Sequence, residues 1–462
     1  MLTELRIQNF KAWRDTGPIR MAPLTVIFGA NSAGKSSLGH LLLALKQTAL
    51  SSDRRRALLL GDANTLIDLG TFRDCVFQHE LTLPLEFEMR WRLPGPLRVR
   101  DVQDATAHYE GDELQLAVTL VSDKKSEQPQ AEVIAYELRN GAQTVLDARL
   151  SRGASAKPEL TSSTFRFVKS DGRKWPLEEP EKFYRASDVT LARFKNAGFL
   201  TDFALATEEM LRGLSYLGPL REHPQRTYQW AGDTPEDVGQ KGQFAIAAIL
   251  AAEQAGRELN RGPKQRRQPF ATFIAAWLKD LGVIHDFSVK PVAKGRKEYE
   301  VLIRTHPAAP EVKLTDVGIG VSQVLPALVQ AFYAPAGSVV WMEQPEIHLH
   351  PRVQAELADA FISAIQAREQ GNPRRLQLIV ESHSEHFLTR LQRRVAEEKV
   401  SPDDVAIYFC KTSGQGTDLV PLELDMFGDI ANWPPDFFGD EMAELTARTV
   451  AAMRRREAEA TK

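Results

Sequence analysis

The chain has 462 residues, enough for two or three packed units with a sizeable core. Its 58 Lys and Arg residues against 61 Asp and Glu residues give a formal net charge of -3, so any contact with a nucleic acid must come from a local basic patch. Two cysteines, Cys75 and Cys410, exclude a disulfide framework and indicate a reducing, cytoplasmic compartment. Charged residues interrupt every long apolar run, so we expect neither a signal peptide nor a membrane span.

The first strong motif is a glycine-rich loop between a predicted strand and a predicted helix. Gly29-Ala-Asn-Ser-Ala-Gly-Lys-Ser36 follows the apolar run 23–28 and opens the apolar-periodic segment 38–50. Backbone amides in such a loop, with the positive end of the helix, bind phosphates. We expect Lys35 to reach the outer phosphates of a nucleotide and the Ser36 hydroxyl to hold Mg²⁺. The predicted nucleotide-binding residues are Gly29, Asn31, Ser32, Ala33, Gly34, Lys35, Ser36 and Ser37.

The middle of the chain changes its periodicity once. From residue 81 to about 170, apolar residues alternate with polar ones between turn residues, which predicts an antiparallel meander. From 186 to 281 the period is helical, with an interruption at 216–223. Arg221 in this interruption either contacts nucleotide phosphates across an interface or holds the turn by hydrogen bonds; both interpretations stay open.

Two short basic runs could bind a polyanion. The run at 53–56 is more typical of a solvated helix end. The loop 261–267, with Arg261, Lys264, Arg266 and Arg267, is the best local candidate for a nucleic-acid contact.

Three further motifs follow in the C-terminal half. Residues 314–323 form a loop of small residues that ends in Ser322 and leads into a helix, an arrangement that presents a hydroxyl and amides to an anion. An apolar strand then ends in Glu343, where a carboxylate can hold the Mg²⁺ that Ser36 also holds. A buried strand over 376–380 precedes His383, which we expect to sense a γ-phosphate or orient water. Two more strands, over 405–424, precede an aromatic tail at 432–438 that we interpret as an anchor.

The chain thus carries four motifs: the loop at Gly29, Val-Gly-Ile-Gly-Val-Ser-Gln, Glu-Gln-Pro-Glu-Ile-His-Leu-His-Pro, and Glu-Ser-His-Ser. Together they resemble the motifs of ABC-type ATPases, in the branch of the OLD, RecF and SMC-like proteins. The Trp-Pro-x-x-Phe-Phe tail and the Leu-Gly-Pro-Leu-Arg stretch resemble standalone AAA ATPases of anti-phage defence. The resemblance implies an α/β fold, an ABC-type P-loop NTPase with a mixed central sheet, an antiparallel β-meander and a helical insert. The expected parts are 1–185, the first part of the ATPase lobe with the meander; 186–285, the helical insert; 286–425, the rest of the lobe; and 426–462, the tail.

The resemblance also implies a homodimer or higher homo-oligomer with composite ATP sites. The loop 29–36 of one subunit would face the signature residues Gly320 and Ser322 of another. His350 and Pro351 would occupy the D-loop position, and Gln78 or His79 the Q-loop position.

The sequence departs from the family pattern beside Glu343. Anchored on Pro345, the usual Asp-Glu pair is Glu343-Gln344, so the metal-binding acid is kept while an amide replaces the general base. An amide orients water but does not accept its proton as a carboxylate does. We therefore expect slow hydrolysis, with Glu343 or Glu346 as a substitute base, and predict Glu343, Gln344, Glu346 and His383 as catalytic residues.

The leading interpretation is an ATP-dependent switch that assembles with and controls a separate effector, a nuclease, in prokaryotic anti-phage defence. Too few residues follow His383 for the Toprim nuclease that OLD relatives carry, so the effector is expected on another chain. ATP and Mg²⁺ are the expected cofactors. Two alternatives stay open: an ATP-bound scaffold with little turnover, and a RecF-like ATPase of DNA repair, which would bind nucleic acid.

Overall fold

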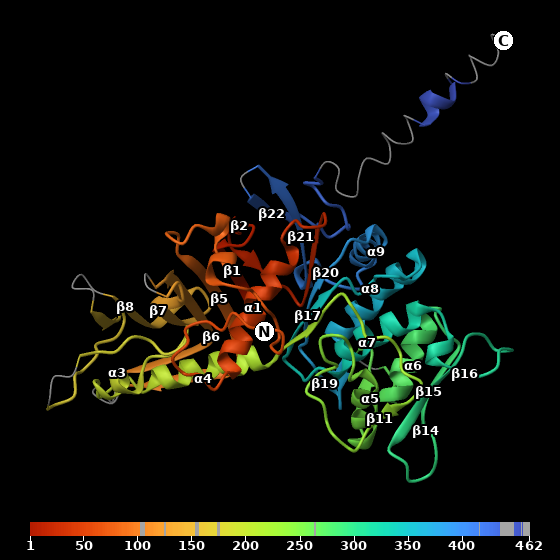
Figure 1. Cartoon of the computed structure of the whole chain (residues 1–462), viewed down its shortest axis with the longest axis horizontal. Coiled ribbons are helices and arrows are strands. Elements are labelled where there is room, and N and C mark those ends of the chain that lie inside the picture. Colours follow the sequence, from red (N-terminus) through yellow and green to blue (C-terminus); the bar gives the residue numbers. More distant parts are fainter. Residues whose placement is uncertain are drawn as a thin grey trace.

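The computed structural model (Figure 1) describes residues 1–101, 107–123, 126–152, 157–172, 176–262, 265–414, 416–434, 448–453 and 455. Its strands form four sheets. A six-stranded sheet lies near the centre, an eight-stranded antiparallel sheet lies at one end, and a mainly helical lobe lies at the other.

The central sheet brings the phosphate-binding motifs to one edge. Its strands, in spatial order, are β10 (Leu214–Leu217), β17 (Val339–Glu343), β20 (Gln377–Glu381), β4 (Leu24–Gly29), β21 (Val405–Ser413) and β22 (Gly416–Leu422). The first five run parallel and β22 is antiparallel. Because parallel strands end at the same edge, the loops after β4, β17 and β20 meet there. This mixed sheet confirms the predicted α/β fold of a P-loop NTPase.

The central sheet separates two hydrophobic cores. Strands β4, β17 and β20 are buried at every position, as is usual for parallel strands covered on both faces. In β17, Val339 and Trp341 belong to one core while Val340 and Met342 belong to the other. Successive side chains of a strand point to opposite faces, so one short segment contributes to both cores.

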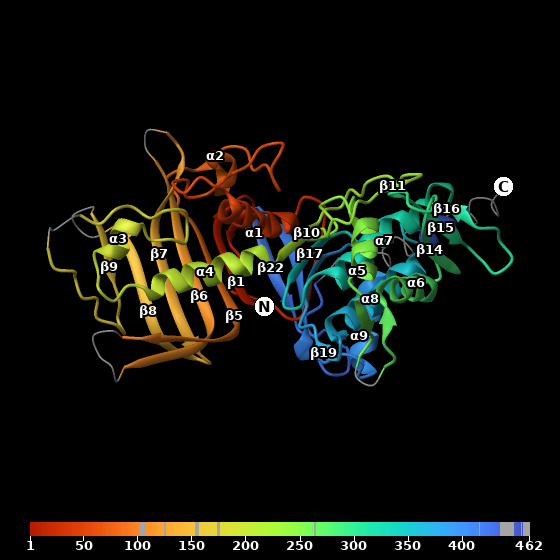
Figure 2. The same ribbon diagram turned by 90° about the horizontal axis from the view of Figure 1, so that it is seen from below.

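The first core lies under the eight-stranded sheet. The strands of this sheet are β2 (Trp13–Asp15), β1 (Leu2–Phe10), β5 (Leu85–Arg100), β6 (His108–Ser122), β7 (Pro129–Asn140), β8 (Gln143–Arg152) and β9 (Pro158–Thr161), with β3 (Ile19–Arg20) paired to β1. The predicted meander is β5 to β8. Figure 2 shows α4 (Phe199–Arg212) running across it.

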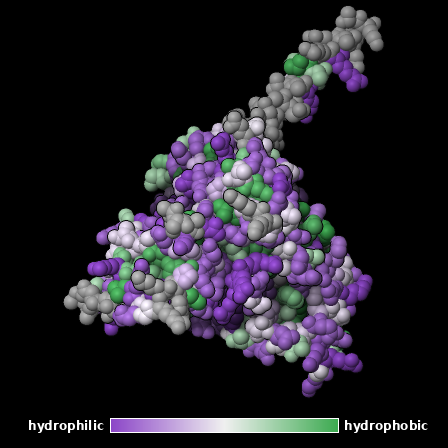
Figure 3. Space-filling model, turned by 60° about the vertical axis from the view of Figure 1, so that its left-hand side comes forward, coloured by the Kyte–Doolittle hydropathy of each residue, from purple (hydrophilic) through white to green (hydrophobic). Residues whose placement is uncertain are grey.

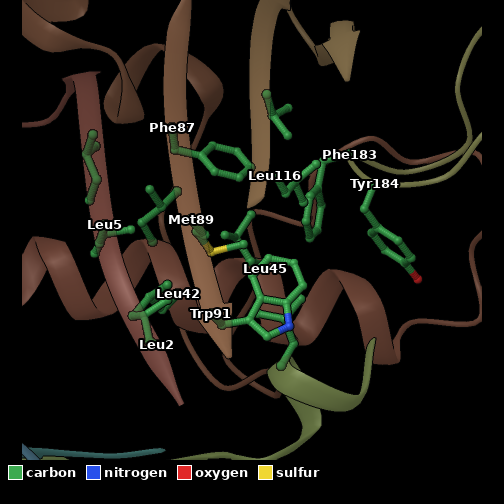
Figure 4. Close-up of a cluster of buried hydrophobic side chains, with 14 of the residues drawn as sticks. Leu2, Leu5, Leu42, Leu45, Phe87, Met89, Trp91, Leu116, Phe183 and Tyr184 are labelled. Carbon is green, nitrogen blue, oxygen red and sulfur yellow. The ribbon is translucent and has the colours of Figure 1, made fainter. Parts of the chain in front are cut away.

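Helix α1 (Lys35–Leu50) joins this core to the nucleotide loop. Its leucines, Leu42 and Leu45 among them, lie beside Met89 and Trp91 of β5 (Figure 4). This packing, more than intrinsic propensity, stabilises the helix that follows the nucleotide loop.

The second core is mainly helical. It is built from α5 (Ala245–Gln254), α6 (Phe270–Asp280), α7 (Ile319–Tyr333), α8 (Pro351–Gln366) and α9 (Glu385–Ala396). Two small sheets accompany these helices: β11 (Tyr228–Gln229), β15 (Glu298–Arg304), β14 (Asp286–Pro291) and β16 (Val312–Lys313), and β13 (Gln268–Pro269), β12 (Glu258–Asn260), β18 (Arg368–Glu369) and β19 (Asn372–Pro373).

The segment 186–285, expected as one helical insert, is divided between the two cores. Helix α4 packs with the first core, β10 joins the central sheet, and α5 and α6 pack with the second core. The helical period does not reveal this division, because it indicates a buried face without naming the surface that covers it.

The remaining described elements are short. They include α2 (Phe72–Cys75) and α3 (Asp188–Ala192). Trp433 of the tail is 47% exposed, while Phe437 and Phe438 and the predicted final helix up to residue 447 lie outside the described residues. The face in Figure 3 is mostly polar, with small apolar groups between polar areas. Among the described helices, none combines the length and apolar character needed to cross a bilayer.

Candidate nucleotide site

The loop between β4 and α1 has the backbone of a phosphate-binding loop. Gly29 and Gly34 have φ angles of 149° and 81°, which side-chain-bearing residues rarely adopt. A Cβ on Gly29 would also lie 2.8 Å from Cys410 on the neighbouring strand β21. Trp13 fixes the end of the loop by donating through Nε1 to the Gly34 carbonyl at 3.1 Å and to Ser37 Oγ at 2.8 Å.

Lys35 is the first residue of α1, and its side chain points back into this loop. Its Nζ donates to the carbonyl oxygens of Gly29 and Ala30 at 2.9 and 2.8 Å. Burial lowers the pKa of the Lys35 ammonium, and the carboxylate of Glu381 opposes this shift. The cation is therefore held at the mouth of the loop, where phosphate oxygens can replace the two carbonyls as acceptors.

Ser36 joins the loop to two acidic strand ends. Its hydroxyl lies 3.0 Å from Glu343 Oε2 at the end of β17 and 2.8 Å from Glu381 Oε2 at the end of β20. The two acids are paired in the register of the two strands. Burial raises the pKa of Glu381 to about 8, and the neighbouring Glu343 charge adds to this shift.

Glu343 is held as the charged member of the pair. Burial disfavours its charge, but His40 and the hydroxyl of Tyr216 outweigh this and lower its pKa. Tyr216 donates to Glu343 Oε1 at 2.6 Å, and His40 Nε2 lies 3.6 Å from the same oxygen. A hydroxyl beside an ionised carboxylate is a donor set of hard oxygens, which suits Mg²⁺. Ser36 and Glu343 thus fit the predicted metal, which would neutralise phosphate charge.

A cavity opens beside this acid pair. It is lined by Asn31, Gln344, Glu346, Ile347, His348, Gln354, His383 and Ser384. The loops after β4, β17 and β20 all contribute to it, so three of the four predicted catalytic residues face the same space as the nucleotide loop.

Glu346 and His383 are joined within the cavity wall. Glu346 Oε1 accepts from the Ser382 hydroxyl at 2.8 Å and from the His383 amide at 2.7 Å. Burial raises the pKa of Glu346, while burial and then the charge of Lys35 lower the pKa of His383. Glu346 therefore supports the His383 loop, and the His383 ring is uncharged at neutral pH and can accept a hydrogen bond.

A family model described as "AAA domain, putative AbiEii toxin, Type IV TA system" matches residues 24–389, which includes the nucleotide loop, both acidic strand ends and His383. The chain belongs to this AAA_21 family. Residues 400–447 match a second model, "Protein of unknown function (DUF3696)". No curated protein matches the chain.

Solved structures similar to this chain include heads of SMC proteins. One is an SMC head bound to the C-winged helix domain of ScpA, with 11% identity, 92% of this chain and 98% of that chain covered, and a TM-score of 0.41. The SMC head domain from Thermotoga maritima has 13% identity, coverages of 91% and 99%, and a TM-score of 0.40. An SMC head with an extended coiled coil, bound to the C-terminal domain of ScpA derived from Pyrococcus furiosus, has 10% identity, coverages of 92% and 96%, and a TM-score of 0.40.

The predicted signature residues, Gly320 and Ser322, both lie in the first turn of α7. Helix α7 begins at Ile319, so Ser322 lies inside its first turn, is 5% exposed and donates its hydroxyl to the Ile319 carbonyl at 2.8 Å. Its hydroxyl thus contacts its own helix, and its facing a nucleotide of another subunit stays a prediction. Ile319, at the start of the helix, is 48% exposed, and Gly320 lies beside Leu349.

The predicted Q-loop residues occupy a turn, whereas the predicted D-loop residues form the start of α8. Gln78 and His79 are both exposed with positive φ, and His79 Nδ1 lies 3.0 Å from the Arg73 carbonyl oxygen. His350 caps α8, accepting from the Arg352 amide, and Pro351 is its first residue.

Several arginines of the two basic runs form ion pairs with aspartates of the same chain. Arg56 lies 3.4 Å from Asp53, and Arg54 lies 3.8 Å from Asp188 of α3. Arg261 pairs with Asp280 at 2.6 Å and stacks over Trp277, while Arg266 and Arg267 are exposed. Lys264 lies outside the described residues.

Sequence reasoning missed Glu381, Tyr216 and His40. For Glu381 a signal was present, because it ends an apolar strand as Glu343 does. Tyr216 and His40 give no such signal, since an aromatic residue in a strand and a histidine in a helix are ordinary. Only the adjacency of β10, β17 and α1 brings them to Glu343.

Proposed function

We propose that this protein is an ATP-dependent switch that closes as a homodimer or larger homo-oligomer and controls a separate effector in anti-phage defence. The observation that carries the ATPase part is the meeting of Lys35, Ser36 and Glu343 at one edge of the central sheet. The family description, which names a putative AbiEii toxin and a type IV toxin–antitoxin system, supports the defence part. A nuclease on another chain is the proposed effector.

In this proposal each residue has a separate task. The loop amides of residues 29–36 and the Lys35 ammonium bind the phosphates of ATP, and Mg²⁺ held by Ser36 and Glu343 neutralises charge on them. Gln344 and His383 face the cavity next to the phosphates, where they orient the attacking water by hydrogen bonds.

Slow turnover follows from the residue at position 344. A carboxylate at this place would take the proton of the water, whereas an amide only orients it. Glu346 is a poor substitute base, because one of its oxygens already accepts two hydrogen bonds. Gln344 also supports a second candidate function, an ATP-bound scaffold in which assembly, not hydrolysis, is the output.

The deciding experiment measures Mg²⁺-dependent ATP hydrolysis and assembly size together, with and without DNA. Lys35→Ala should abolish both ATP binding and ATP-dependent assembly, while the matched variant Lys241→Ala, an exposed lysine outside the loop, should change neither. Gln344→Glu should raise kcat by about 10²-fold or more, the scale of general-base catalysis. Gln354→Glu adds a carboxylate to the same cavity and serves as its control.

The outcomes separate the candidates. Assembly without turnover in both wild type and Gln344→Glu would favour the scaffold. ATP-dependent assembly that is unaffected by Lys35→Ala would contradict the switch. Stimulation of hydrolysis by DNA would favour the repair interpretation.

A further inference from the structure

Arg221 is a buried cation at the edge of the candidate site. It follows β10 and lies beneath the end of β17, where its Nη2 donates to the Glu343 carbonyl oxygen at 3.2 Å. The residue is 8% exposed. Within the described part of the chain, its Nε and Nη1 atoms are buried and have no hydrogen-bond partner. A guanidinium carries five donors in a rigid fork, so this side chain is only partly satisfied.

Glu346 is a buried acidic side chain whose hydrogen bonding is also incomplete. It is 5% exposed, and its Oε1 accepts from Ser382 and His383. Its Oε2 atom is buried and has no hydrogen-bond partner among the described residues. A carboxylate oxygen in this situation has lost its hydration without gaining a donor.

The two incomplete groups lie on either side of the turn that carries Gln344. Arg221 holds the backbone at Glu343, and Glu346 lies three residues later in the chain and holds the His383 loop. The charge of Glu346 raises the pKa of Arg221, and the charge of Arg221 lowers the pKa of Glu346, although burial dominates the pKa of each group. Buried charges of opposite sign are tolerated when they pair, and an unpaired one is costly, so both groups favour an arrangement in which they meet.

We propose that Arg221 is a positioning residue whose free N–H groups pair with the free oxygen of Glu346 when ATP binds, and that this pair fixes Gln344 against the γ-phosphate. The inference rests on the proposed ATPase function. It explains why an arginine from a loop outside the nucleotide motifs is buried against the Glu343 backbone. It also gives Glu346 a role as a support and not as a base.

A double-mutant cycle tests the pairing. The variants are Arg221→Met, which keeps the apolar stem, Glu346→Gln, which keeps an acceptor for Ser382 and His383, and the double variant. Arg226→Met is the matched control, because Arg226 lies in the same loop but is exposed and pairs with Asp316. Both kcat and KM for ATP are measured, and the ratio of ATP to ADP affinity is measured on the same proteins.

Each single variant should lower kcat about tenfold while KM for ATP changes less than twofold, because positioning and not binding is lost. The ATP-over-ADP affinity ratio should stay within twofold of the wild-type ratio for the same reason, while the rate of a single turnover of bound ATP should fall about tenfold with kcat. The double variant should be no worse than the worse single variant. Arg221→Lys should recover part of the loss, and Arg226→Met should behave as wild type.

Two results would overturn the pairing. One is an Arg221→Met protein with wild-type kcat and a wild-type single-turnover rate. The other is a double variant whose loss is the product of the two single losses. If either occurs while ATP binding still depends on Lys35, this inference alone fails; if ATP binding does not depend on Lys35, the proposed function fails and this inference fails with it.

Discussion

The Ser36 hydroxyl and the Glu343 carboxylate lie 3.0 Å apart although 307 positions separate them in the chain. The contact joins the start of α1 to the end of β17 across the edge of the central sheet. Both residues are fixed by their elements, so the fold itself holds the pair together. Preorganised ligands of this kind lower the cost of ordering a metal and its phosphates.

The first prediction concerns which of the two acids next to Ser36 carries the metal. Glu343→Gln should raise the Mg²⁺ concentration needed for half-maximal ATP binding at least tenfold, since it removes the ionised carboxylate. Glu381→Gln should change it less than threefold, because Glu381 is 1% exposed and its Oε1 accepts from Trp341 Nε1 at 2.7 Å. Titration of ATP binding with Mg²⁺ measures both. Equal losses in the two variants would show that both acids hold the ion.

The second prediction concerns the start of α7. In a dimer closed over ATP, we expect Ile319 to lie at the interface and Ser322 to lie within its own helix. Ile319→Glu should therefore abolish ATP-dependent assembly, because it places a charge at a surface that closure desolvates. Ser322→Ala should leave assembly unchanged. Light scattering with and without Mg·ATP measures the mass, and loss of assembly in Ser322→Ala alone would restore the sequence-based assignment.

The nucleotide loop could be predicted from local sequence, whereas the start of α7 depends on packing. The spacing of Gly29, Gly34, Lys35 and Ser36 is local, so the loop and its helix could be predicted without any knowledge of packing. The start of α7 could not be predicted in this way, because Gly318 and Gly320 both permit a helix to begin. The choice between them depends on contacts with distant residues such as Leu349.

The surroundings of Glu343 and the packing of the segment 186–285 could not be predicted from local sequence either. Glu343 could be predicted because a proline turn follows it, whereas its partners Tyr216 and His40 come from β10 and α1, and no periodicity reveals that these elements are neighbours of β17. The division of residues 186–285 between two cores was missed for the same reason.

The third prediction concerns the pH dependence of stability at Asp147 in β8. This carboxylate accepts hydrogen bonds from the backbone amides of Ser163 and Thr164 and from the hydroxyls of Ser162, Ser163 and Thr164. Burial opposes its charge, but these bonds lower its pKa to about 2, against 3.8 for the free side chain. A lowered pKa means that the stabilisation is fully present above pH 3.8 and is lost as the pH falls toward 2.

Asp147→Asn should therefore lower the free energy of unfolding at pH 7, and the deficit should shrink as the pH approaches 2. Denaturant unfolding of both proteins at several pH values measures the difference. Asp112→Asn, which changes an exposed aspartate of β6 in the same sheet, is the control and should show no such trend. A deficit that stays constant with pH would mean that the side chain acts through shape and not through its charge.

The fourth prediction concerns Gly39, which lies inside α1 directly over the ring of Trp341. A Cβ at this position would lie 2.5 Å from Trp341 Cε2 and 2.7 Å from its Nε1, closer than real contacts allow. Helix propensity alone predicts that Gly39→Ala stabilises the protein by about 1 kcal/mol. Overpacking against a buried ring costs about 1–3 kcal/mol, and Trp341 cannot turn away without losing its hydrogen bond to Glu381.

We therefore expect Gly39→Ala to be destabilising by about 1 kcal/mol or more, the opposite sign to its propensity, as measured by denaturant unfolding. Gly198→Ala, at the start of α4 where a Cβ would meet no atom within 4 Å, should be neutral or stabilising. Because α1 also carries Lys35 and Ser36, pushing it away from β17 should weaken Mg·ATP binding as well, and the Gly198 variant should not. A stabilised Gly39→Ala protein with normal nucleotide binding would show that α1 can move away from β17 without disturbing the site.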